Sequence, residues 1–451
     1  MGRKPKNIPA SKKEKKTNKP RTGDGNKRGV VRLRGVKDIL PDEYKYWNLV
    51  LRKAEEIITY YGFKKVEIPV LEKLSLYERS TGRQTDIVSK EMFFFIDKDG
   101  EKVALRPEAT PSLVRSYIEH GLFSWPIQPI KLYWIGNLFR REKPQSGRNR
   151  QFSQIDLEIF NEASPVADAQ LIQIAYLILK ELQIETHVQI NSIGCQECRP
   201  EYVNKLVDYY KDRQKKKKLC LDCKKRMQKN PLRLLDCKNE SCLEARLEAP
   251  QIVDHLCDEC RDHFVKVLEY LDELEVTYSL NPYLVRGLDY YTRTVFEIWP
   301  EDSETGRQNA LGGGGRYDDL IEQMGGRPTP ACGWAMGIER MILKIKENNI
   351  VAADTYKPDI FLAQLGEQAK RKAMVFFEDL RAKKYKIAQN FVKDGLKPQL
   401  ELANKLGVKV TLILGQKELM DGTILFRDME SGNQEVVDFK KVYEELDKRL
   451  N

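Results

Sequence analysis

The segment Leu284–Glu297, which reads LVRGLDYYTRTVFE, decides how the rest of the chain is interpreted. Its β-branched and aromatic residues predict a strand. In a regular strand Asp289, Arg293 and Glu297 would share one face, and Arg286 would lie on the other. Because a buried unpaired charge is costly, these groups must meet water, one another or a ligand. The segment is therefore either a solvated edge strand or the wall of a binding site.

Length and composition define the broad class of protein. The 451 residues are enough for two or three domains, and 41% of them are hydrophobic, as in soluble proteins. No apolar run approaches the length of about 18 residues that a membrane-spanning helix needs. The N-terminus has no apolar segment typical of a secretory signal. We therefore expect a cytoplasmic protein without membrane contact, in which the nine cysteines are reduced.

Residues 1–29 are expected to form a basic, disordered tail. Residues 1–28 contain eleven Lys or Arg against Glu14 and Asp24, so this segment carries most of the net charge of +10. A Lys-, Pro- and Asn-rich segment of this kind cannot form a core. It would act either as a solubilising arm or as a non-specific phosphate-binding arm sensitive to salt.

Hydrophobic spacing and turn residues divide the remaining chain into five parts. They are a core segment (30–194), a helical Cys-rich insertion (195–280), a second core segment (281–346), a linker (347–357) and an α/β unit (358–451). In the core we predict helices over 42–61, 164–184 and 334–346, a hairpin over 91–105, and strands over 63–70, 131–136, 152–160 and 187–193. The first helix and the strand after it are also a candidate dimer surface.

The loop 140–150, between two predicted strands, is strongly cationic. Against a lone Glu142 it carries Arg140, Arg141, Lys143, Arg148 and Arg150. Arginine binds phosphate bidentately, so a nucleotide or a nucleic-acid backbone is the natural partner, and a soluble hairpin loop is the alternative. On the next strand Gln154 and Glu158 share a face. An amide and a carboxylate on one face could bind an ammonium group or an imidazole N–H, and a solvated strand face is the alternative.

Two glycine-containing segments follow. Gly312–Gly315 lacks the Gly-Lys-Ser/Thr of a Walker A motif and is expected to let a ligand approach a strand backbone. In Gly333–Arg340, the small residues Ala335 and Gly337 leave room for a flat ring on which Arg340 can stack. The alternative is a close helix–strand contact.

Together these segments resemble the three signature motifs of class II aminoacyl-tRNA synthetases. The counterparts of motifs 1, 2 and 3 are residues 62–69, 139–152 and 333–340. The opening segment is similar to the histidine-specific signature of the histidyl-tRNA synthetase family. The resemblance covers about residues 30–451 and implies an α+β fold. In that fold a six-stranded antiparallel catalytic sheet carries the Cys-rich insertion, and a C-terminal α/β anticodon-binding domain follows.

Residue by residue, the resemblance implies roles across these motifs. The catalytic residues would be Arg140 and Arg286, both at the α-phosphate of ATP. ATP would also be contacted by Glu142, Arg148, Arg150 and Arg340. Histidine would be bound by Arg83, Gln84, Thr85, Gln154, Glu158, Tyr290 and Tyr291. Gln145 would lie where the family reads the acceptor end of the tRNA.

Within the histidine-binding set, Thr85 and Gln154 would hold the ammonium group, and Glu158 and Tyr291 would bracket the imidazole. Arg83 departs from the family, because many members have glutamate there and a cation cannot bind an ammonium group. The implied activity is histidine–tRNA ligation, with ATP, Mg²⁺, L-histidine and tRNA(His) as reactants and a homodimer as the assembly. The chemistry brings two anions together, which paired arginines can neutralise without a protein nucleophile.

Two other functions are compatible with this fold. A non-catalytic synthetase paralogue that regulates histidine biosynthesis typically lacks the anticodon domain and erodes the histidine signature. An RNA-binding protein that kept only the fold would not be expected to retain Arg140, Arg286 and Arg340 together.

The insertion contains four cysteine pairs. They are Cys195 and Cys198, Cys220 and Cys223, Cys237 and Cys242, and Cys257 and Cys260. Two such pairs suit one tetrahedral zinc, so eight thiolates could hold two ions; reduced buried cysteines are the alternative. Cys332 stands alone and is expected to pack as a small apolar residue. The resemblance implies that the insertion clamps the tRNA acceptor arm, to which Arg213–Lys218 (RQKKKK) would contribute unless it is a solvated helix face.

Overall fold

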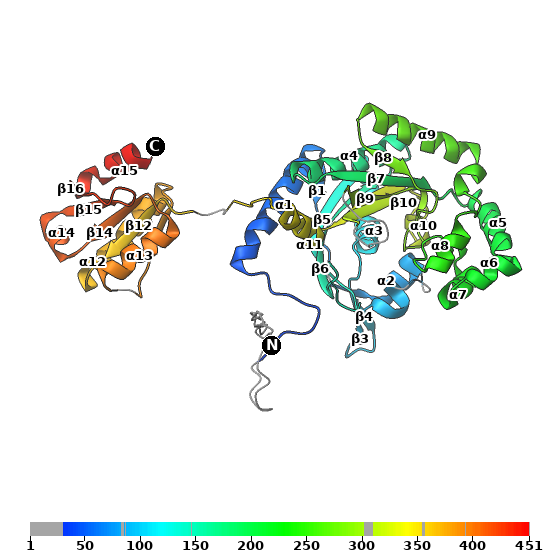
Figure 1. Cartoon of the computed structure of the whole chain (residues 1–451), viewed down its shortest axis with the longest axis horizontal. Coiled ribbons are helices and arrows are strands. Elements are labelled where there is room, and N and C mark those ends of the chain that lie inside the picture. The colour runs from blue at the N-terminus through cyan, green and yellow to red at the C-terminus, as the bar shows by residue number, and fades with distance from the viewer. Residues whose placement is uncertain are drawn as a thin grey trace, which may run out of the picture.

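A sheet of eight strands organises the core of the molecule (Figure 1). The computed structural model describes residues 30–82, 85, 87–145, 147–301, 310–353, 357–392 and 394–450. The predicted basic tail lies outside this set, as do Arg83 and Gln84. The sheet order is β1-β5-β6-β11-β10-β9-β7-β8. The strand bounds are β1 Lys64–Lys65, β5 Ile130–Phe139, β6 Gln151–Phe160, β7 Thr186–Ser192, β8 Tyr278–Leu280, β9 Thr292–Pro300, β10 Gly312–Arg316 and β11 Ala331–Gly337.

The six inner strands, from β5 to β7 in the sheet order, pair only antiparallel. The edge strands β1 and β8 add in parallel to β5 and β7. The predicted six-stranded antiparallel sheet is therefore confirmed. The predicted strand over 63–70 shrinks to the two residues of β1, and the chain passes Pro69 before it pairs again.

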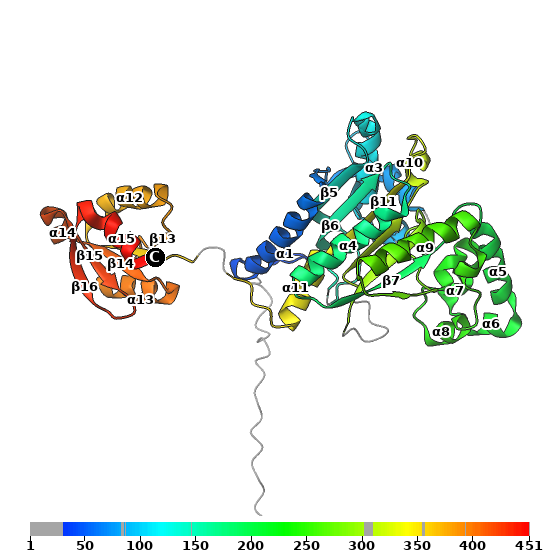
Figure 2. The same ribbon diagram turned by 90° about the horizontal axis from the view of Figure 1, so that it is seen from above.

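Four helices cover one face of the sheet: α1 Pro41–Tyr60, α4 Pro165–Glu181, α9 Asp258–Glu273 and α11 Ile338–Glu347 (Figure 2). Their apolar sides share one hydrophobic cluster with the sheet, which includes Val50, Ile174, Val267 and Met341. Helix α1 ends as predicted, because Gly62 adopts a φ of 82° that only glycine accepts easily. The opposite face of the sheet carries α3 Thr110–Glu119 and α10 Leu320–Gln323.

A smaller sheet of three strands lies beside the core, in the order β2-β4-β3. It consists of β2 Leu71–Lys73, β3 Phe94–Ile96 and β4 Lys102–Leu105. The predicted hairpin over 91–105 is its β3–β4 pair. The short helix α2 Leu74–Tyr77 packs against it through buried Tyr77.

The Cys-rich insertion is helical, as predicted. It contains α5 Arg199–Lys211, α6 Arg213–Lys218, α7 Leu221–Lys229, the 3-10 turn η4 Pro231–Leu234, α8 Glu240–Arg246 and the turn η5 Ile252–His255. Its buried residues, such as Tyr202, Leu206 and Tyr210, belong to the same cluster as Tyr290 and Tyr291 of the core. The insertion therefore packs directly on the histidine signature. The last part of the range 195–280 belongs to the core in space, because α9 packs on α4 and β8 joins the main sheet.

Residues 360–450 form a second α/β unit with its own core (Figure 1). Its sheet has the order β13-β12-β14-β15-β16, parallel over the first three strands and antiparallel over the others. The strands are β12 Ile360–Gln364, β13 Ile387–Gln389, β14 Val410–Leu414, β15 Thr423–Asp428 and β16 Gln434–Asp438. The helices are α12 Glu367–Ala382, α13 Leu396–Leu406, α14 Gln416–Asp421 and α15 Val442–Leu450.

The histidine signature is not the regular strand that its composition predicts. Residues 284–291 form a loop, and β9 begins only at Thr292. Arg293 adopts a φ of 48°, and the register with β10 shifts at this point. The predicted alternation of faces is therefore wrong. Arg286 and Glu297, expected on opposite faces, form an ion pair of 2.8 Å.

The predicted helix over 334–346 also starts too early. Residues up to Gly337 form β11, where Trp334 pairs with Leu157 on one side and Gly314 on the other. The helix α11 begins at Ile338, so Arg340 lies in its first turn.

Candidate active site

A cavity of about 540 Å³ lies on the sheet face opposite the four helices, because Gln154 and Asp156 of β6 line it whereas Ile155 and Leu157 pack in the hydrophobic cluster of those helices. It is lined by the β5–β6 loop, β6, the signature loop (284–291), β10, β11, the start of α11 and part of the insertion. The predicted residues that line it are Arg140, Glu142, Arg148, Gln154, Arg286, Tyr290, Tyr291 and Arg340. Segments far apart in the sequence thus meet at one place.

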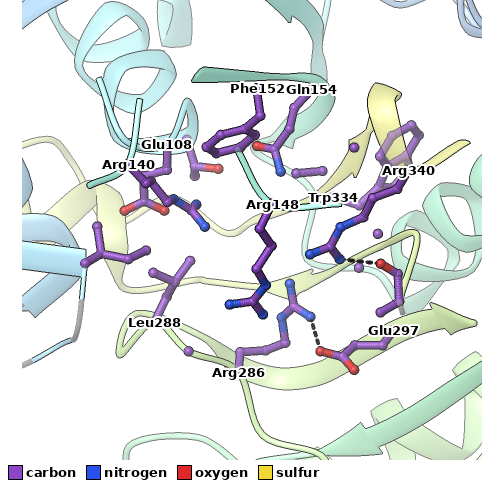
Figure 3. Close-up of a pocket in the computed structure, with 18 of the residues that line it drawn as sticks. Glu108, Arg140, Arg148, Phe152, Gln154, Arg286, Leu288, Glu297, Trp334 and Arg340 are labelled. Atoms are coloured by element: carbon purple, nitrogen blue, oxygen red, sulfur yellow. Dashed lines mark hydrogen bonds and ion pairs between the residues drawn. The ribbon is translucent and has the colours of Figure 1, made fainter. Parts of the chain in front are cut away.

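Four of the arginines that line this cavity come from three segments: Arg140 and Arg148 from the loop 140–150, Arg286 from the signature loop and Arg340 from α11 (Figure 3). Arg140 donates through Nε to the Pro107 carbonyl at 2.9 Å, and Arg148 binds Glu142 at 3.0 Å. Arg340 donates to the Ala310 carbonyl at 2.5 Å. Burial lowers the pKa of Arg340, and the charges of Arg148 and Arg140 lower it further. Such mutual repulsion favours a bound polyanion.

Arg286 is held at the opposite wall. Its Nη1 donates to Glu297, and its guanidinium lies 5.6 Å from the centre of the Tyr291 ring. Its buried Nε has no hydrogen-bond partner among the described residues, so this donor is available to a ligand. Gly313 is required here, because a Cβ would come within 2.8 Å of Arg286 Nη1 and 2.5 Å of the Phe296 carbonyl.

Three buried carboxylic acids lie at the other end of the cavity. Glu108 and Asp156 line it, and Glu158 lies just beneath its floor. Glu158 accepts from Thr110 at 2.6 Å and from the Tyr317 hydroxyl. Burial raises the pKa of Glu158 to about 8 and the pKa of Asp156 well above its ordinary range. A bound cation would stabilise the ionised form of these carboxyl groups and so lower their pKa values.

The acids are surrounded by tyrosines. The ring centres of Tyr290 and Tyr291 are 4.7 Å apart, and Tyr317 lies 5.7 Å from Tyr290 and 6.5 Å from Tyr291. The Tyr290 hydroxyl donates to Glu108 at 3.3 Å. Gly333 must be glycine, since a Cβ there would lie 1.6 Å from Glu158 Oε2. The site therefore combines an acidic aromatic end with an arginine-rich end.

Some predicted site residues lie elsewhere. The Thr85 hydroxyl donates to the Gly82 carbonyl at 2.8 Å, and Thr85 lines a second cavity of about 510 Å³ instead of the first. Thr85 therefore does not line the cavity that contains Gln154, and its role in holding the histidine ammonium group stays a prediction. Arg150 donates to the Glu142 carbonyl at 3.3 Å and does not line the cavity, because its position is fixed by backbone pairing with Gly35. Gln145 is exposed in the β5–β6 loop.

The sequence interpretation missed Glu108, Thr110, Asp156 and Tyr317. The run Arg106–Pro111 leads into α3 and places Glu108 and Thr110 at the cavity, but it contains no charge pattern that predicts a site. Asp156 lies between Gln154 and Glu158 in the alternation of β6, so the same pattern that selected its neighbours could have selected it.

The eight insertion cysteines form two clusters, each able to hold a metal ion. One contains Cys195, Cys198, Cys257 and Cys260, and the other contains Cys220, Cys223, Cys237 and Cys242. Within each cluster the sulfurs lie within 4.8 Å of one another. The sulfurs of Cys195 and Cys198 lie 3.8 Å apart, and those of Cys220 and Cys237 lie 3.9 Å apart. A tetrahedron with Zn–S bonds of about 2.3 Å has edges of about 3.8 Å, so the geometry fits zinc. Cys332 is buried outside both clusters.

The antiparallel sheet and its arginine-lined cavity define a class II aminoacyl-tRNA synthetase. The family model described as histidyl-tRNA synthetase matches residues 35–341, and one described as anticodon binding domain matches 359–449. The chain belongs to the histidyl-tRNA synthetase family.

Individual relatives agree with this assignment. The histidine–tRNA ligase of Desulfotalea psychrophila is 45% identical over 91% of this chain and 94% of its own length. That of Thermodesulfovibrio yellowstonii is 43% identical over 89% and 94%. The crystal structure of the apo histidyl-tRNA synthetase of S. aureus superposes with a TM-score of 0.77 at 32% identity, covering 92% of this chain and 99% of that one. Among the helices described here, none combines the length and apolarity needed to cross a bilayer.

Proposed function

We propose that this protein is a histidine–tRNA ligase. It would activate L-histidine with ATP to histidyl-adenylate and transfer the histidyl group to the 3′ end of tRNA(His). The observation that carries the proposal is that one cavity joins four arginines, suited to ATP, to a buried acidic and aromatic end, suited to a cationic amino acid. The match to an anticodon-binding domain over 359–449 favours this function over a regulatory paralogue without that domain.

ATP, bound with Mg²⁺ as in the family, would lie among the arginines. Arg340 would stack on the adenine. Arg148, whose guanidinium is held by Glu142, would bind the outer phosphates. Arg140 and Arg286 would flank the α-phosphate. An oxygen of the histidine carboxylate attacks the α-phosphorus, and the bond to the β-phosphate breaks to release pyrophosphate. The two arginines neutralise the charge that gathers in this step.

Histidine would occupy the acidic end. Gln154 and the carboxylates of Glu108 and Asp156 would bind its ammonium group; Asp156 supports this role because its Oδ2 has no hydrogen-bond partner among the described residues. Tyr291 and Glu158 would select the imidazole. Because both oxygens of Glu158 are engaged by Thr110 and Tyr317, the imidazole would displace one of these hydroxyls or act through it. An apolar competitor would leave these groups unpaired.

The transfer step tests this proposal. The purified protein should attach labelled histidine to a tRNA(His) transcript in the presence of ATP, and the terminal ribose hydroxyl should attack the acyl carbon with release of AMP. Arg286→Ala should abolish charging while leaving the protein folded. Folded intact protein that charges no tRNA(His) would refute the proposal.

We further propose that each cysteine cluster holds one structural zinc ion. The tetrahedral spacing of the sulfurs supports this, and so do backbone amides that donate to them, such as Cys195 N to Cys198 Sγ at 3.3 Å and Cys220 N to Cys242 Sγ at 3.2 Å. Such donors stabilise thiolates. Gln145, exposed in the β5–β6 loop, and the cations of α6 would contact the tRNA acceptor arm.

The protein is also proposed to be a cytoplasmic homodimer. The small sheet leaves a contiguous apolar stretch open to solvent, with Phe94 57%, Phe95 47% and Ile96 62% exposed. Such a surface is typical of an interface. Size-exclusion chromatography with light scattering should give twice the mass of the chain, and Phe95→Asp should shift the protein towards the monomer. A monomeric intact protein would contradict this.

A further inference from the structure

The loop between Cys223 and Cys237 joins the second cysteine cluster to the histidine signature. Both of its ends are fixed in that cluster, where the sulfurs lie within 4.8 Å of one another. The loop contains most of α7 and the turn η4 and forms part of the cavity wall. We call it the cluster loop.

Two side chains of the cluster loop bind the signature loop. Arg233 donates through Nη1 to the Arg286 carbonyl at 3.2 Å, and Asn230 donates to Asp289 Oδ1 at 2.6 Å. Gly287 leaves room for this contact, since a Cβ there would lie 3.0 Å from Arg233 Nη1. The Arg233 bond reaches Arg286, whose Nε has no hydrogen-bond partner among the described residues, and the Asn230 bond holds the same loop three residues further on.

Several contacts fix the position of the Arg233 side chain and of the turn that carries it. Its side chain is 16% exposed, and its guanidinium also lies 3.6 Å from Asp236. The Arg233 carbonyl accepts from Arg226 Nη1 at 3.4 Å, which ties η4 back to α7. Residues 284–291 have no regular structure of their own, so external donors such as Arg233 determine where the Arg286 backbone lies.

We propose that Arg233 is a positioning residue for histidine activation, and that the cluster loop sets the placement of Arg286 at the α-phosphate. This inference rests on the proposed function. It means that the insertion contributes to adenylate formation before any tRNA is present. A displacement of Arg286 would weaken an interaction made mainly in the transition state, so the rate would fall more than substrate binding.

The experiment compares three variants of the full chain in the absence of tRNA. Arg233→Met removes the donors at similar length, and Arg233→Lys keeps one. Lys211→Met is the control, because Lys211 is exposed at the end of α5 in the same module and contacts neither the signature loop nor the cavity. The single-turnover rate of histidyl-adenylate formation, the KM values for ATP and histidine, the melting temperature and the zinc content are measured for each.

Arg233→Met should lower the rate constant by about ten-fold, the effect of one lost hydrogen bond to a charged centre, with both KM values within about two-fold of the intact protein. Arg233→Lys should recover part of the rate, and Lys211→Met should match the intact protein. Melting temperature and zinc content should not change. A rate for Arg233→Met within about two-fold of the intact protein would overturn the inference.

A second variant keeps the inference testable if Arg233→Met does not fold correctly. If Arg233→Met lowers the melting temperature or the zinc content, Asn230→Leu, which removes only the bond to Asp289, takes its place with the same expected loss of rate. An unchanged rate per folded molecule would then overturn the inference. If instead the intact protein forms no histidyl-adenylate, the proposed function itself has failed.

Discussion

At the residue scale, the three buried acids are the chemically most unusual part of the molecule. Glu108, Asp156 and Glu158 all have a raised pKa, with burial as the largest cause. Above the ordinary pKa of a carboxyl group, the folded protein therefore binds protons more tightly at these positions than the unfolded chain does. For Glu158, whose pKa rises from 4.5 to about 8, this pH range lies between those two values.

The first prediction concerns Glu158→Gln. Between the two pKa values only the folded state keeps the proton, so the free energy of unfolding of the intact protein falls as pH rises, by about 1.4 kcal/mol per pH unit for this group. The variant should lose that contribution and show a flatter profile from about pH 5 to pH 7.5. Denaturant unfolding followed by tryptophan fluorescence measures it. The exposed Glu269→Gln is the matched control; parallel profiles for Glu158→Gln and the intact protein would contradict the account.

Charge and spacing were enough to find the arginines and Glu158, but not Glu108 or Asp156. Arg140, Arg148, Arg286 and Arg340 stand in charged or glycine-containing patterns that predicted a ligand site, and all four line the cavity. Glu108 has no such pattern, because its role depends on burial beneath Tyr290 and Thr81, which belong to distant segments. Contacts between segments so far apart in the sequence depend on the tertiary fold and cannot be read from a local pattern.

At the scale of elements, the cysteine pairs also show that a local pattern does not predict which distant segments meet. Their spacing predicted two metal sites, and the structure forms two clusters. The first pair combines with the fourth, and the second with the third, which spacing alone did not specify. Spacing defines which sulfurs share a turn, whereas packing of α5, α8 and α9 decides which turns meet.

The second prediction concerns these clusters. Cys242→Ala should reduce the zinc content from about two ions per chain to about one, because three ligands and a methyl group cannot complete a tetrahedral site. Elemental analysis of the purified protein measures it. Cys332→Ala, outside both clusters, should keep both ions. Intact protein without zinc would remove the metal proposal and leave the fold unaffected.

The signature segment shows where strand periodicity fails. Its composition predicts an extended strand throughout, but eight of its residues form a loop and a left-handed Arg293 interrupts the pairing. This irregularity brings Arg286 onto Glu297. Local backbone exceptions of this kind concentrate at functional sites and are not visible in a propensity pattern.

At the scale of the whole molecule, the core and the C-terminal unit have separate hydrophobic clusters. The third prediction follows from this separation. A chain that ends at residue 346 should still form histidyl-adenylate, because every residue that lines the cavity precedes that point. It should charge tRNA(His) far more slowly, because the anticodon-binding unit is absent. Equal charging by the two chains, compared at equal concentrations of adenylate-forming sites, would contradict the proposed role of residues 358–451.

The most direct test of the central claim is ATP–pyrophosphate exchange by the intact protein with each of the twenty amino acids in turn. The account predicts exchange that depends on L-histidine and is lost in Arg286→Ala. Exchange with another amino acid, or no exchange from folded protein, would contradict it.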